Sequence, residues 1–197
     1  MYNSKWNNNI KYMESVSMLK SIRTNLDVVE AMLYYWQATS EKEKVGEPYI
    51  LSIGNFKEMQ YVYGEEFDKE SVRKVLSAIS NREMLNSESK KDRKFWNNNM
   101  WMLEDLEFTN MMVRPLKILN LNGFVEKLNS INSNIQYDII EVIFVPGHLD
   151  EYIIDDNKLV INFFRVMPDL YEEDKVTIAG KELHDYIEEK LVELISK

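Results

Sequence analysis

The sequence of 197 residues predicts a mixed α+β protein. Apolar residues at helical spacing dominate residues 1–116, whereas runs of β-branched and aromatic residues separated by turn residues dominate residues 117–197. A last amphipathic segment predicts a C-terminal helix that covers a small antiparallel sheet. We therefore expect a mostly helical N-terminal region, 1–116, packed in one compact unit with an α+β region, 117–197.

The first predicted helix runs from about Ser15 to Thr39, because apolar residues recur in steps of three and four and form one seam. This seam could pair with a second copy of the chain. It is shorter than four heptads and lacks regular flanking charges, so packing inside the protein is the favoured interpretation. The seam consists of Leu19, Ile22, Leu26, Val29, Leu33 and Trp36.

A turn at Val45–Pro48 is followed by an apolar run, 49–53, which predicts a short strand. Asp68 is a suitable N-cap for a helix that ends near Asn81. The segments 95–106 and 108–113 are rich in methionine and aromatic residues, and Pro115 predicts a helix boundary nearby.

Three strands are expected in the C-terminal region, at 139–145, 152–154 and 159–166. Because the connections are short and contain turn residues, we expect antiparallel pairing, with residues 155–158 at a hairpin tip. Residues 176–178 form a further candidate strand. The final helix presents one apolar face, made of Leu183, Ile187, Leu191 and Leu194.

The net charge of −9 lies entirely in the C-terminal part. Residues 120–197 hold 16 acidic and 7 basic side chains, whereas residues 1–119 hold 17 of each. An acidic surface disfavours nucleic acid and anionic lipid there. No apolar stretch approaches the ~18 residues of a membrane span, so we expect a cytoplasmic protein without membrane partners. The frequent asparagine, lysine and isoleucine indicate an AT-rich bacterial genome.

Several chemistries are excluded by composition. The chain has no cysteine, which rules out thiol nucleophiles and thiolate metal sites. Its six glycines form no phosphate-binding loop or dinucleotide fingerprint, and no serine-nucleophile motif is present. No cofactor is therefore evident from the sequence.

Two histidines provide the candidate catalytic or metal site. His148 has Asp150 and Glu151 as acidic neighbours, and His184 lies in the final helix. Imidazole and carboxylate groups can bind a divalent metal, and a metal-bound water can hydrolyse a substrate. Their spacing matches no metal-binding motif, so a solvated loop histidine is the favoured interpretation. Arg165, on a predicted strand, is either an anion clamp or a partner of a nearby acid.

The segment Lys69–Lys94 is the best candidate for binding nucleic acid, because it contains eight basic and four acidic residues and leads into aromatic residues. Its mixed signs are also typical of an ordinary solvated helix, and the chain as a whole is acidic, so nucleic acid is not the favoured partner. The residues that would make these contacts are Lys90, Lys91, Arg93, Lys94 and Trp96.

The leading hypothesis is a non-catalytic cytoplasmic binding or interaction protein, because the chain has a surplus of apolar side chains and no catalytic motif. Helices dense in tyrosine, tryptophan and methionine would offer the contact surface, within a homodimer or to another protein. The alternatives are a hydrolase that uses a divalent metal at His148 and His184, and a nucleic-acid-binding protein.

Overall fold

The computed structural model describes residues 18–148, 151–172 and 174–197. The helices are α1 (Asp27–Ser40), α2 (Glu47–Gly54), α3 (Lys69–Asn81), α4 (Lys90–Glu104), α5 (Leu106–Lys117), α6 (Val125–Ile131) and α7 (Leu183–Ile195). The strands are β1 (Ser21–Asn25), β2 (Ile139–Val145), β3 (Tyr152–Asp155), β4 (Lys158–Asn162), β5 (Val166–Pro168), β6 (Val176–Ile178) and β7 (Lys181–Glu182). Helices α1 to α6 follow one another between β1 and β2, and the remaining strands and α7 come after them, which confirms the predicted α+β class.

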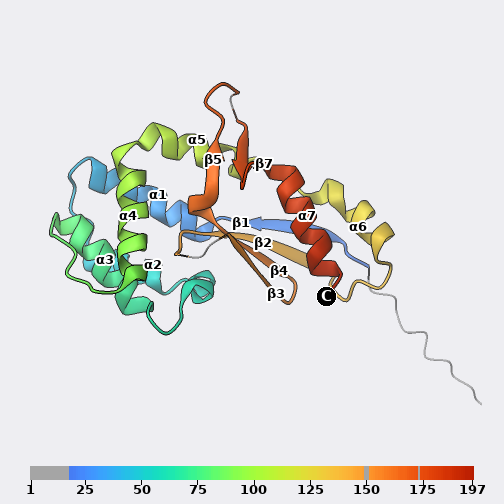
Figure 1. Ribbon diagram of the computed structural model, residues 1–197, viewed down its shortest axis with the longest axis horizontal. Helices are drawn as coiled ribbons and strands as arrows, with labels where there is room; N and C mark the ends of the chain where they lie inside the picture. The colour runs from blue at the N-terminus through green and yellow to red at the C-terminus, as the bar shows by residue number, and fades with distance from the viewer. Residues whose placement is uncertain (1–17, 149–150, 173) are drawn as a thin grey trace, which may run out of the picture.

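The larger sheet has the strand order β1-β2-β4-β3. The strands β1, β2 and β4 run parallel, and β3 is antiparallel to β4. The smaller sheet, β5-β6-β7, is antiparallel throughout. Helices α1 to α5 gather at one end of the molecule, and α6 and α7 lie toward the other end beside the larger sheet (Figure 1). No helix of the described residues is long and apolar enough to cross a membrane.

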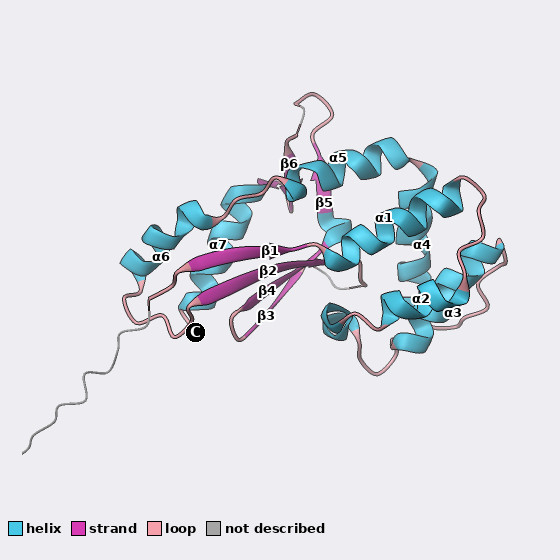
Figure 2. Cartoon of the chain, turned by 180° about the vertical axis from the view of Figure 1, so that it is seen from behind, coloured by secondary structure: helices cyan, strands magenta, loops and turns pink. Residues whose placement is uncertain are grey.

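One continuous hydrophobic cluster joins the helical end to the sheet. The indole ring of Trp36 in α1 stacks on Phe163, just after β4, with a centroid separation of 5.7 Å. The inner strands β2 and β4 are apolar and largely buried, as central strands are when both faces are covered. The apolar face of α7 is buried as predicted, and this helix packs on β4 and β6. Figure 2 shows the same arrangement from behind.

The predicted helix over Ser15–Thr39 is wrong in its first half. Ser15 lies outside the described residues, and Ser21–Asn25 forms a strand whose partner, β2, is more than a hundred residues away. The side chain of Asn25 accepts a hydrogen bond from the backbone N–H of Asp27 at 3.0 Å, where α1 begins. Leu19 and Ile22 are both buried, and apolar residues at these positions are compatible with a helix as well as with a strand. A local apolar pattern therefore cannot reveal a pairing with a distant strand.

The predicted strand at 49–53 is also wrong, since these residues belong to α2. Pro48 lies in the first turn of this helix. That turn has no intrahelical acceptor for its N–H groups, so a proline fits there and marks a helix start. By contrast, α3 begins where predicted, and the Asp68 carboxylate accepts the N–H of Ser71 at 2.9 Å. Helix α5 ends two residues after Pro115, near the expected boundary.

The strands lie where predicted, but one pairing differs. The β3–β4 hairpin is antiparallel, with its tip at Asp156 and Asn157, as expected. Strand β2 does not pair with β3: it lies parallel to β4. The expected strand 159–166 is interrupted by a 3-10 turn at 163–165, because the buried side chain of Asn162 accepts the N–H of Phe164 at 3.2 Å and turns the chain.

Candidate functional site

His148 is held by structural contacts at the end of β2. Its Nε2 lies 2.7 Å from the carbonyl oxygen of Val62, and its ring meets the edge of the Phe67 ring at 4.7 Å between centroids. A carbonyl oxygen only accepts hydrogen bonds, so Nε2 carries the proton in this contact. Burial lowers the pKa of His148 below its ordinary value. This imidazole acts as an anchor between the segment 57–62 and β2.

His184 lies in the first turn of α7 and contacts other partners. Its Nδ1 is 3.4 Å from Glu182 Oε1, and Glu151 accepts a hydrogen bond from the Tyr186 hydroxyl at 3.2 Å. No contact among the described residues joins the two histidines. The described chain contains no group of three or more histidine and acidic side chains arranged to hold a metal ion, and Asp150 lies outside it. The hydrolase hypothesis stays a prediction without a supporting contact.

Arg165 does not occupy the strand position on which its predicted role as an anion clamp was based. It is exposed at the end of the 3-10 turn 163–165, between β4 and β5. The role of Arg165 as an anion clamp or as the partner of a nearby acid stays a prediction.

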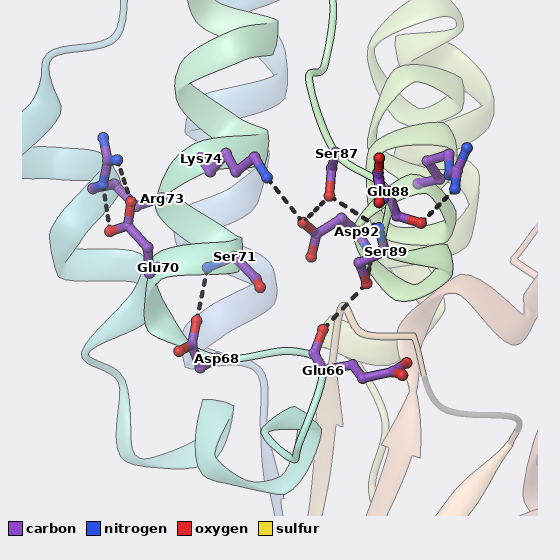
Figure 3. A network of polar contacts seen from close by, with 11 residues as sticks. Glu66, Asp68, Glu70, Ser71, Arg73, Lys74, Ser87, Glu88, Ser89 and Asp92 are labelled. Carbon is purple, nitrogen blue, oxygen red and sulfur yellow. Dashed lines mark hydrogen bonds and ion pairs between the residues drawn. The ribbon is translucent and has the colours of Figure 1, made fainter.

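The basic segment is largely engaged in contacts within the protein, as Figure 3 shows for α3 and the start of α4. Arg73 forms ion pairs with Glu70 and with Glu47, the latter at 2.9 Å. Lys74 lies 3.6 Å from the buried carboxylate of Asp92. Each of these cations already has an anionic partner, which a phosphate would have to displace.

The residues predicted to contact nucleic acid differ in their contacts and in their exposure. The guanidinium of Arg93 donates to the Glu88 carbonyl, and Lys94 Nζ donates to the His148 carbonyl at 2.8 Å. Lys90 is exposed and Lys91 is half-buried near the start of α4. Trp96 is partly buried against the core, so its ring face is not freely offered to a base. The geometry therefore adds no support to nucleic-acid binding.

A polar cluster lies on the face of the larger sheet near a small cavity of about 70 Å³. The amide Nδ2 of Asn25 donates to Glu58 at 3.1 Å and to Glu141 at 2.9 Å. One amide group thus occupies the place between the two carboxylates that a cation would take. Lys158 lines the same cavity, with its Nζ 5.8 Å from the centroid of the Tyr61 ring. The Asn25 amide satisfies the two carboxylates from within the protein.

A pocket with several apolar lining residues lies between the C-terminal ends of α1 and α3 and the second half of α4. Its volume is about 460 Å³, within the range of small-molecule sites. Helix α4 contributes Trp96, Met100 and Leu103, which share one face because they are spaced by four and three residues. The other lining residues are Thr39, Ser40, Ile79, Arg82, Glu83, Met84 and Glu104. We call this site the α1–α3–α4 pocket.

The end of α3 shapes one wall of this pocket. Arg82 adopts a left-handed backbone conformation, with φ of 57°, and terminates the helix. Its guanidinium donates to the Lys42 carbonyl at 2.6 Å, which ties the wall to the segment after α1. Met84 follows and is 93% exposed, so a flexible apolar side chain stands at the pocket.

One buried polar atom of a lining residue, the indole Nε1 of Trp96, has no hydrogen-bond partner among the described residues. The side chain of Thr39, another lining residue, is within hydrogen-bonding reach of the Tyr35 hydroxyl. Buried polar groups are nearly always paired, since leaving one unpaired costs about 1–3 kcal/mol. A mostly apolar pocket with a few polar groups is typical of a small-molecule site.

Sequence reasoning named Trp96 but assigned it to nucleic acid, and it did not single out Thr39. The spacing of Trp96, Met100 and Leu103 is a signal of a helix face, but it is the same for a core face and for a pocket wall. Only the positions of α1 and α3 distinguish the two. Comparisons with family models, with curated proteins and with solved structures find no match to this chain.

Proposed function

We propose that this protein is a non-catalytic binding protein whose α1–α3–α4 pocket receives a small, largely apolar ligand. The observation that carries the proposal is the pocket itself, about 460 Å³ in volume, with Trp96, whose buried indole Nε1 is unpaired, among its lining residues. Removing an apolar surface of this kind from water is favourable in proportion to its area.

The test uses Nile red, an uncharged dye whose fluorescence rises in apolar surroundings. We expect saturable binding with one dye per chain. Met100→Trp should fill the pocket and reduce dye affinity at least tenfold, because the larger ring takes the volume that the dye needs. The matched control, Met167→Trp, changes an exposed methionine of β5 outside the pocket and should leave dye binding unchanged. Equal dye binding by all three proteins would contradict the proposal.

A homodimer is the second part of this proposal. Trp101 projects from α4 and is 71% exposed, and large aromatic side chains are enriched where proteins associate. Sedimentation velocity should show a dimer for the natural chain and a monomer for Trp101→Lys. A natural chain that sediments as a monomer over a hundredfold range of concentration would remove the dimer from the proposal.

The two alternatives have direct tests of their own. The hydrolase hypothesis predicts that Zn²⁺ or Mn²⁺ raises the melting temperature, and that His148→Ala and His184→Ala both abolish the rise. The nucleic-acid hypothesis predicts binding that weakens steeply with salt and is lost when Lys90 and Lys91 become Glu. A positive result in either test would displace the proposed function.

A further inference from the structure

We infer that the ligand of the α1–α3–α4 pocket is a neutral molecule with an apolar body and a carbonyl-type oxygen that accepts the Trp96 indole N–H. This inference rests on the proposed function and names the chemical class of its ligand. Three features support it: the hydrogen-bond donor of Trp96, a lining methionine that can move, and the charged side chains at the edge of the pocket.

The indole nitrogen decides which polar group the ligand carries. Trp96 Nε1 can only donate a hydrogen bond, and it has no acceptor among the described residues. A carbonyl oxygen of the ligand has lone pairs that could accept this hydrogen bond. A purely hydrocarbon ligand would leave the indole donor unpaired.

Movement of the Met100 side chain would give a ligand access to the indole N–H group of Trp96. The indole Nε1 of Trp96 is buried from water, so a ligand oxygen reaches it only when a neighbouring side chain moves. Met100 lies one helical turn after Trp96 on the same face of α4 and lines the pocket. Its unbranched side chain has three rotatable bonds and can move at low cost. The same side chain can then pack against the apolar body of the ligand.

The edge of the pocket disfavours an anion. Glu83 and Glu104 contribute two negative charges, and the one lining cation, Arg82, already donates to the Lys42 carbonyl. A carboxylate ligand would meet net negative charge and lose its hydration on entry. A ketone, ester or amide oxygen supplies the acceptor without this penalty.

The experiment compares three nine-carbon probes, 2-nonanone, nonane and nonanoate, by their displacement of Nile red. For the natural chain we expect the ketone to bind about tenfold more tightly than nonane, the factor expected when a buried donor gains its acceptor. Nonanoate should bind more weakly than the ketone. Trp96→Phe keeps an aromatic ring without the N–H group and should bind the dye while losing the ketone's advantage. Tyr171→Phe, the matched control, changes an exposed aromatic residue outside the pocket and should retain that advantage.

The outcomes separate the two proposals. If Nile red does not bind the natural chain and no probe raises its melting temperature, the proposed function fails. If the dye binds but ketone and hydrocarbon displace it equally, the inferred ligand class is wrong while the binding function stands. A ketone advantage that persists in Trp96→Phe would overturn the assignment of Trp96 as the donor, and tighter binding of nonanoate would overturn the neutral ligand.

Discussion

Asn99 shows how one residue can connect two parts of the core. Its side chain accepts the Trp36 indole N–H at 2.9 Å and donates to the Phe95 carbonyl at 2.8 Å, with no exposed surface. The neighbouring Asn97 and Asn98 have the same side chain and are less buried. Composition alone therefore cannot identify the structural asparagine, because its role depends on Trp36, which is 63 residues away.

We predict that Asn99→Ala lowers the free energy of unfolding by about 1–3 kcal/mol, since it leaves the buried Trp36 N–H without an acceptor. Denaturation by urea, followed by circular dichroism, measures this change. Asn97→Ala is the matched control and should stay within about 0.5 kcal/mol of the natural chain. Equal effects of the two substitutions would show that the Trp36–Asn99 bond is not important for stability.

His148 makes stability depend on pH. Burial lowers its pKa below the ordinary 6.5, so the unfolded chain binds a proton where the folded chain does not. The contribution is present above pH 6.5 and is lost as the pH falls toward the folded-state pKa. Between pH 7.5 and 5.5 the free energy of unfolding should fall less in His148→Gln than in the natural chain. His184→Gln should behave like the natural chain, and an NMR titration that finds the His148 pKa above 6.5 would contradict the assignment.

At the scale of elements, helix ends were easier to predict than the partners of strands. Asp68 caps α3 through a bond to a residue only three positions away, so a short sequence window contains the whole interaction. Strand β1 depends on β2, and Ile22 is paired with Ile140. The same apolar spacing is compatible with a helix, which is why the sequence predicted one there.

The cap of α3 gives a prediction at this scale. Asp68→Ala should reduce the free energy of unfolding by about 1 kcal/mol, because the Ser71 N–H loses its acceptor in the first turn. Asp68→Ser retains an N-cap oxygen and should recover most of the loss. Both values come from urea denaturation. An alanine variant as stable as the natural chain would mean that the cap does not stabilise α3.

For the whole molecule, the contact between Trp36 and Phe163 joins the helical end to the sheet. Because the buried residues form one cluster, we predict one cooperative unfolding transition for the full chain. Tryptophan fluorescence and far-UV circular dichroism should give the same midpoint, and Phe163→Leu should lower both by the same amount. Two separate transitions would show that residues 1–116 and 117–197 unfold as independent domains.

By itself the sequence determined the fold class, the extent of α3 and α7, the positions of the C-terminal strands and the absence of thiol chemistry. These features depend on periodicity, capping and composition, which act over a few neighbouring residues. Tertiary structure alone decided that β1 is a strand, that β2 lies parallel to β4, that His148 bonds to Val62, and that Trp96 faces a pocket. The physical reason is the same in each case: the partner is distant in the chain, and burial and hydrogen bonding are settled only where the two segments meet.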